Sequence, residues 1–154
     1  MMKKFVGLGS AMLLAGAVLG SVSPVLAEEA GKAITIAPPP AGMGQVVFFR
    51  TGGSGFALGC QVNQNDQRVS ALGAGKYFVH VAAPGPQTFM VSSEAKDVLN
   101  LEVEAEETQY VRCKIKMGIM VGRPNLEPST KADFDKASHK LKLVDADDMG
   151  PKAP

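Results

Sequence analysis

Apolar and polar residues alternate along most of the chain after position 44, and this period of two predicts β-strands. The alternation is most regular in 110–117. There the polar members are Arg112, Lys114 and Lys116, and the residues expected to face inward are Val111, Cys113, Ile115 and Met117. Further strands are predicted at 45–50, 56–62, 68–72, 76–81, 88–92 and 98–104.

Turn-forming residues separate these strands, and helix signals are sparse. Gly52-Gly53-Ser54-Gly55 and Pro84-Gly85-Pro86 are interpreted as turns. Thr130 followed by Asp133 resembles a capping box, which predicts a short helix ending near Ser138, and a last strand is expected within 140–144. Many short strands and one short C-terminal helix predict an all-β fold, either a small antiparallel β-sandwich or an open barrel.

The first 27 residues have the order of a secretory signal peptide. Lys3 and Lys4 precede an uncharged, mostly apolar stretch, and small or β-branched residues stand before Glu28. Cleavage is expected between Ala27 and Glu28. The alternative is an uncleaved transmembrane anchor, which Pro24 and the several glycines of this stretch disfavour.

Three parts follow the signal peptide, and the length suggests a single domain. Residues 28–43 are a Pro- and Gly-rich lead-in, in which 33–36 is a candidate edge strand. Residues 44–144 form the β-sandwich domain, and residues 145–154 are expected to be a flexible tail.

Charge argues against nucleic-acid binding. The chain has 16 basic and 15 acidic residues, a net charge of +1, with no clustered basic excess to neutralise phosphates. Removal of the signal peptide takes away Lys3 and Lys4, and the remaining 14 basic and 15 acidic residues give a net charge of −1. This balance does not favour an anionic membrane, and no membrane insertion is expected after the signal is removed.

The two cysteines, Cys60 and Cys113, stand at inward positions of two predicted strands. Export would place them in an oxidising compartment, where disulfides persist. A bridge closing this loop stabilises by roughly 4 kcal/mol in the chain-entropy model. The alternative is a pair of free thiols packed as small hydrophobic groups.

No cofactor, metal or catalytic site is predicted, and the protein is not expected to be an enzyme. The histidines and cysteines lack ligand spacings such as His-x-His or Cys-x-x-Cys, and Met117 and Met120, which are three apart, are interpreted as core or surface methionines. A serine triad can be written from Ser92, His80 and Asp97, but no Gly-x-Ser-x-Gly elbow supports it. The Gly-rich loop at 52–55 lacks the Lys-Ser/Thr pair of a phosphate-binding loop.

The segment 118–124 holds three apolar residues between two glycines, directly after a predicted strand. Because apolar runs are usually buried, we expect it to close one end of the sandwich. If it is exposed instead, Ile119 and Met120, with Arg123 as a polar anchor, are candidate contacts for a partner protein.

Four stretches of the chain together resemble a known sequence pattern. They are Gly75-Lys76-Tyr77-Phe78-Val79, Ala83-Pro84-Gly85-Pro86-Gln87-Thr88-Phe89, Tyr110-Val111-Arg112 and Met117-Gly118-Ile119-Met120-Val121-Gly122-Arg123-Pro124. Together they resemble a family of small bacterial envelope domains of unknown function, close in pattern to PEGA-type and other prealbumin-like β-sandwich modules. The resemblance spans 44–127. It implies a prealbumin- or Ig-like sandwich and a secreted location, and it assigns no catalytic residue.

The expected function is therefore that of a secreted, non-catalytic β-sandwich domain in the periplasm or outside the cell. It would act by contact with an envelope protein or in a structural role. The alternative is a periplasmic ligand-binding module for a sugar or a metal. Sugar recognition usually uses exposed aromatic rings, and this chain has no Trp and only Tyr77 and Tyr110, both on predicted strands.

Overall fold

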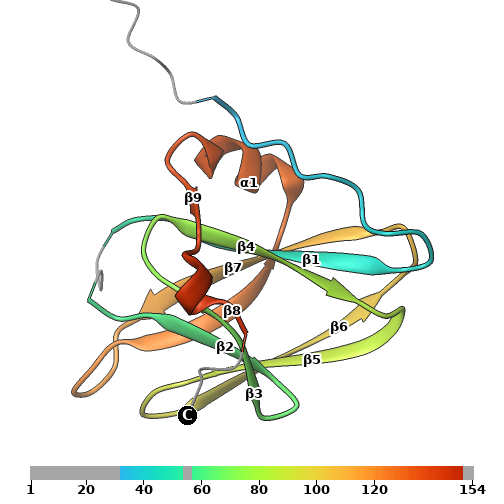
Figure 1. Ribbon diagram of the computed structural model, residues 1–154. Coiled ribbons are helices and arrows are strands. Elements are labelled where there is room, and N and C mark those ends of the chain that lie inside the picture. The colour runs from blue at the N-terminus through green and yellow to red at the C-terminus, as the bar shows by residue number, and fades with distance from the viewer. Residues whose placement is uncertain (1–31, 54–56, 151–154) are drawn as a thin grey trace, which may run out of the picture.

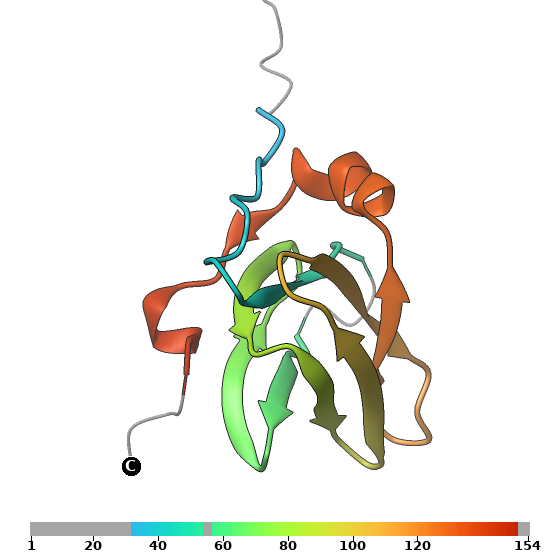
Figure 2. The ribbon, with the colours of Figure 1, turned by 90° about the vertical axis from the view of Figure 1, so that its right-hand side faces the viewer.

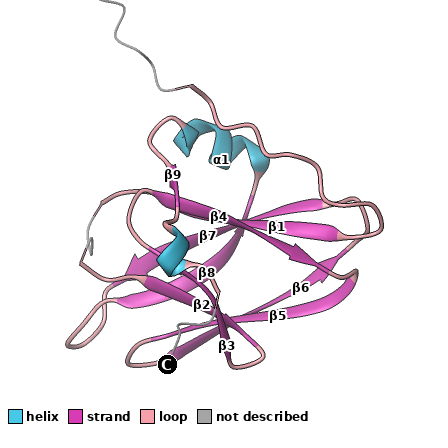
Figure 3. Ribbon diagram, viewed as in Figure 1, coloured by secondary structure: helices cyan, strands magenta, loops and turns pink. Residues whose placement is uncertain are grey.

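Two stacked β-sheets form the body of the molecule, and a helix lies over the outer face of the larger sheet (Figures 1 and 3). The computed structural model describes residues 32–53 and 57–150. The strands are β1 (Gly44–Arg50), β2 (Cys60–Gln64), β3 (Gln67–Leu72), β4 (Lys76–Ala82), β5 (Gly85–Ser92), β6 (Lys96–Val103), β7 (Thr108–Lys116), β8 (Arg123–Ser129) and β9 (Lys142–Leu143). The helices are α1 (Lys131–Ser138) and the short 3₁₀ turn η1 (Ala146–Asp148).

One sheet has the order β8-β7-β1-β4-β9 and the other has the order β3-β2-β5-β6. The predicted class, an all-β sandwich with one short helix, is confirmed. The four-stranded sheet is antiparallel as expected, but the five-stranded sheet is mixed, because β1 runs parallel to β7 and β4 runs parallel to β9. We call the five-stranded sheet the large sheet and the four-stranded sheet the small sheet.

The main core lies between the two sheets and is built from the inward residues of the alternating strands. Phe48 on β1 stacks on Phe78 of β4, with ring centroids 4.8 Å apart, and Phe89 of the small sheet meets Phe48 edge-on at 4.9 Å. Cys60 and Cys113 belong to the same core. The alternation of 110–117 therefore identified the correct inward face as far as Ile115.

A second apolar cluster covers the outer face of the large sheet. Its centre is Phe134 of α1, whose ring meets Phe49, Tyr77 and Tyr110 at centroid distances of 5.4, 5.7 and 5.5 Å. Figure 2 shows α1 lying across this sheet, on the side away from the small sheet. With a core on one face and α1 on the other, all seven residues of β1 are buried.

Local sequence explains where α1 begins. The side chain of Thr130 accepts a hydrogen bond from the backbone N–H of Asp133 at 3.1 Å, and Thr130 itself has extended backbone angles. This is the geometry of an N-cap. The predicted helix start is thus confirmed with Thr130 as its N-cap, although the Asp133 carboxylate accepts from the Thr130 hydroxyl and not from its backbone N–H as in a capping box. The helix ends at Ser138 as expected.

Several predicted boundaries were wrong. Met117 is 95% exposed and follows β7 instead of facing the core, since β7 ends at Lys116. Strand β8 was not predicted, because Pro124 and Pro128 argue against a strand. Gly85 and Pro86 belong to β5 and not to a turn, and the only regular part of 140–144 is the two-residue strand β9.

Both ends of the described chain lie against the domain. The lead-in forms no strand at 33–36, but Ile34 and Ile36 pack against the Phe134 cluster. The expected tail contacts β3, where the N–H of Gly150 donates to the carbonyl of Val69 at 2.7 Å and Met149 pairs with Ser70. The expected signal peptide and the region around Phe56 lie outside the described residues.

Candidate functional site

An exposed apolar loop joins β7 to β8, and it is the candidate site. We call residues 117–122 the β7–β8 loop. Met117, Ile119 and Met120 are 95%, 87% and 88% exposed, and Val121 is 46% exposed. Single exposed apolar residues are normal on a protein surface, whereas a group of four on one short loop is typical of an interaction site.

The expectation that this segment closes one end of the sandwich was wrong. The β7–β8 hairpin continues past the core, so the apolar run comes after the last inward residue, Ile115. Glycine avoids close contacts at both ends of the run. A Cβ at Gly118 would collide with the carbonyl oxygen of Val121, and a Cβ at Gly122 would meet Ile115 and Leu58. The two glycines therefore permit a tight loop that holds its apolar side chains outward.

A single carboxylate fixes the backbone of this loop. Glu94 lies in the β5–β6 turn, and one of its oxygens accepts hydrogen bonds from the N–H groups of Met120 and Val121 at 2.9 and 3.0 Å. The other oxygen accepts from the N–H of Ile119 at 3.2 Å. The hydrogen bonds from Val121 and Met120 lower the pKa of Glu94 below its ordinary value. The loop is therefore held by the charged form of this side chain.

Arg123 adds a second contact to the same carboxylate. Its Nε lies 3.4 Å from Glu94 Oε2, and the Arg123 side chain is 41% exposed. Arg123 is the first residue of β8, directly after the loop. Of the predicted contact residues, Ile119 and Met120 are thus at the surface, and Arg123 helps to anchor the base of the loop.

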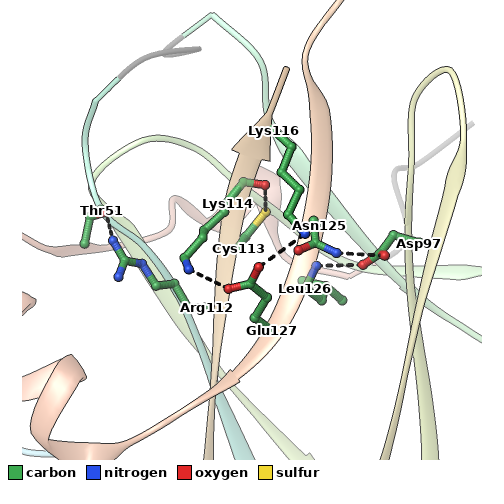
Figure 4. Close-up of polar contacts among 9 residues, drawn as sticks. All are labelled: Thr51, Asp97, Arg112, Cys113, Lys114, Lys116, Asn125, Leu126 and Glu127. Atoms are coloured by element: carbon green, nitrogen blue, oxygen red, sulfur yellow. Dashed lines mark hydrogen bonds and ion pairs between the residues drawn. The ribbon is translucent and has the colours of Figure 1, made fainter. Parts of the chain in front are cut away.

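Charged residues stabilise the hairpin that carries the loop (Figure 4). Glu127 of β8 lies between two lysines of β7, with Lys114 Nζ at 2.6 Å and Lys116 Nζ at 3.4 Å from its oxygens. These contacts, that of Lys114 first, lower the pKa of Glu127. The two strands of the hairpin below the loop are therefore connected by a cluster of three charged side chains.

The two cysteines lie face to face in the core, with their sulfur atoms at disulfide distance and their Cα atoms 6.6 Å apart. That Cα separation is within the range that a disulfide spans. Cys60 belongs to β2 and Cys113 to β7, so the pair connects the two sheets.

Sequence reasoning identified the loop but missed Glu94. No local signal marks this residue, because it lies 25 to 27 positions before its partners and in a different hairpin. Only the packing of the small sheet beside β8 brings the β5–β6 turn to the loop; both β5 and β6 contact β8.

The other chemistry-bearing residues have structural partners. His80 lies 3.0 Å from Gln64 Oε1 and edge-on to Phe89, and its burial lowers its pKa. Asp97 accepts hydrogen bonds from β8 residues, and no hydrogen bond links it to His80 or Ser92 in the described chain. Within residues 32–53 and 57–150, no three His, Cys, Asp or Glu residues form a metal-ligand group. None of the helices described there is long and apolar enough to cross a membrane.

Comparisons with known proteins place the chain in a family. No solved structure matches it. A protein of Haemophilus influenzae, described as uncharacterized, is 25% identical over 138 residues, which cover 89% of this chain and 81% of the relative. A family described as "Protein of unknown function (DUF2846)" matches residues 40–124, from just before β1 to the start of β8. Because this match covers more than half of the chain, the protein belongs to the DUF2846 family.

Proposed function

We propose that this protein is an exported, non-catalytic β-sandwich domain that binds a protein of the bacterial cell envelope through the β7–β8 loop. The observation that carries the proposal is the exposure of Met117, Ile119 and Met120 on a loop whose backbone is fixed by Glu94. A loop that is already held in one conformation loses little conformational entropy when it binds. More of the free energy gained by burying its apolar side chains therefore contributes to affinity.

The composition of the loop fits a protein surface. Methionine is flexible and polarisable, and it adapts to irregular apolar recesses. Lys96, Lys116 and Arg123 lie around the base of the loop, together with Asp97. Because Arg123 is paired with Glu94 and Lys116 with Glu127, the base of the loop has no marked excess of charge, and the complementary partner surface is an apolar recess.

Two features support export. The N-terminal 27 residues have the pattern of a signal peptide, and the cysteine pair at disulfide distance suits an oxidising compartment such as the periplasm or the extracellular space.

Site-specific crosslinking in intact cells tests this function. A photoreactive phenylalanine analogue at Ile119 is expected to give one discrete crosslinked product. The same analogue at Val98, which is 51% exposed on β6, provides the matched control and is expected to give none. The substitution Met120→Asp should reduce the Ile119 product at least about tenfold, because a buried unpaired charge opposes docking. Val98→Asp should leave the product unchanged.

Two outcomes would contradict the proposal. Equal crosslinking from Ile119 and Val98 would show that the loop makes no specific contact. Flotation of the purified protein with liposomes, abolished by Met120→Asp, would show that the loop binds lipid and not protein.

A further inference from the structure

A cleft lies between α1 and the end of β1, and it is separate from the β7–β8 loop. Its volume is about 550 Å³, which is in the range of small-molecule sites. Thr51 and Arg112 line it on the side of the large sheet, and Lys136, His139 and Lys140 line it on the side of α1 and the segment that follows. We call it the cationic cleft.

Positive charge dominates the cationic cleft. Three basic side chains, Arg112, Lys136 and Lys140, line it beside a single carboxylate, that of Asp133. Asp133 Oδ2 already accepts a hydrogen bond from the Thr130 hydroxyl at 2.9 Å. In the described residues no ion pair neutralises any of the three cations.

Arg112 carries the clearest signal. One guanidinium nitrogen donates to Thr51 Oγ1 at 2.9 Å (Figure 4), but its Nε is buried and has no hydrogen-bond partner. The hydrogen-bond partner of its charge is thus a neutral hydroxyl and not a carboxylate. Lys114, two positions along the same strand and on the same face, is by contrast paired with Glu127 at 2.6 Å. The unmatched cation is therefore the one that lines the cleft.

We propose that the cationic cleft binds a small organic anion through a phosphate or carboxylate group. Arg112 donates to an oxygen of that group from the terminal N–H groups of its guanidinium, because the planar guanidinium presents several N–H donors in a fixed arrangement. Lys136 and Lys140 attract the same group from the other wall. Ala137 and Leu141 also line the cleft and offer an apolar surface to the rest of the ligand.

Titration followed by NMR tests the site on the purified protein. The probes are inorganic phosphate, phenyl phosphate and benzoate, each compared with sodium chloride at equal ionic strength. At least one probe is expected to give saturable shifts of the amides of Gly52, Arg112 and Leu141, and chloride none. Comparison of phenyl phosphate with benzoate identifies the preferred group, and comparison with inorganic phosphate measures the contribution of the apolar wall.

Substitutions assign the binding to named side chains. Arg112→Gln should weaken the best probe at least about tenfold, as expected for a charge-assisted hydrogen bond. Lys114→Gln removes the same charge from the same strand outside the cleft, and it should change the affinity by less than about twofold because solvent and salt screen distant charges. Lys136→Gln combined with Lys140→Gln alters only exposed positions and should also weaken binding at least about threefold, which keeps the test valid if Arg112→Gln does not fold.

Several outcomes would overturn the inference. Shifts that do not saturate, or that chloride reproduces, would mean that the cleft attracts ions without a site. Equal weakening by Arg112→Gln and Lys114→Gln would mean that only the general field matters. Met120→Asp should leave probe binding unchanged, so failure of this site and failure of the loop as a protein contact are distinguishable.

Discussion

The carboxylate of Asp97 on β6 accepts a hydrogen bond from the backbone N–H of Leu126 on β8, at 2.8 Å, although the two strands belong to different sheets. Its other oxygen accepts from the Asn125 amide, also at 2.8 Å. In an edge strand, the N–H groups of alternate residues point to the same side. On the outer side of β8 these residues are Pro124, Leu126 and Pro128, and proline has no N–H group. The outer edge of β8 thus offers no free donor along 124–128 to another strand.

Removing the Asp97 carboxylate should weaken the contact between β6 and β8. Asp97→Ala leaves the N–H of Leu126 and the Asn125 amide without their acceptor, so we expect a loss of about 1–3 kcal/mol in the free energy of unfolding. Denaturant titration measures it. Glu102→Ala, at an exposed position of the same strand, is the control. A loss no greater than that of the control would contradict this role for Asp97.

A disulfide between Cys60 and Cys113 should stabilise the fold by restricting the conformations open to the unfolded chain. The loop spans 53 positions, and the chain-entropy model gives roughly 4 kcal/mol for a loop of that size. We expect the double substitution Cys60→Ala and Cys113→Ala to lower the free energy of unfolding by about 2–5 kcal/mol. A reducing agent should destabilise the wild type and leave the double variant unaffected. Two alkylatable thiols in the untreated protein would disprove the bridge.

Phe134 should account for most of the attachment of α1. Its ring contacts Phe49, Tyr77 and Tyr110, and it is 1% exposed. Truncating a buried phenylalanine to alanine typically costs 3–5 kcal/mol, and we expect Phe134→Ala to cost about as much. Lys136→Ala, exposed on the same helix, should change stability by less than about 0.5 kcal/mol. Comparable losses in both variants, measured by thermal unfolding, would contradict this assignment.

Acid should release the β7–β8 loop. The folded protein holds the pKa of Glu94 below its ordinary value of 4.5, so the charged form is the one that binds the loop. The contribution of Glu94 to loop order is therefore complete above that ordinary value and disappears as the pH falls through the lower pKa of the folded state. Backbone relaxation measured by NMR should show Ile119, Met120 and Val121 becoming mobile over this range.

Glu94→Gln is the matching variant for the acid experiment. The substitution keeps one carbonyl oxygen but turns an NH₂ group toward N–H donors of the loop. We expect the three amides to be mobile in this variant at every pH. A loop that stays ordered in the variant, or that becomes mobile at the same pH with and without the carboxylate, would show that Glu94 does not hold it.

The alternation of apolar residues was enough to predict most of the fold. Val111, Cys113 and Ile115 face the core as their spacing requires, because a strand has only two faces. The alternation does not show which strands lie side by side in a sheet, so the parallel pairing of β1 with β7 was not predicted. Strand β8 was missed since its prolines are tolerated only at an edge, and an edge is a property of the assembled sheet.

The candidate sites could be predicted only in part, because the exposure of a side chain depends on the assembled fold. Ile119 and Met120 stood out as apolar residues between glycines, although their exposure depends on how far the hairpin extends beyond the core. Glu94 and the cationic cleft were not predictable. Arg112 looks in the sequence like any outward-facing cation, and its place in a cleft becomes visible only when α1 lies beside it.

The position of β1 between β4 and β7 has a consequence for how the chain reaches its final state. Ribosomes and export channels release a polypeptide from its N-terminus, so the apolar run Val46-Val47-Phe48-Phe49 emerges early. Its parallel neighbour begins only at Thr108, which pairs with Gln45. Long-range pairings of this kind form slowly and leave strands open to aggregation in the meantime. In the nascent chain the β7 side of this apolar run therefore stays uncovered until Thr108 and the residues after it can dock.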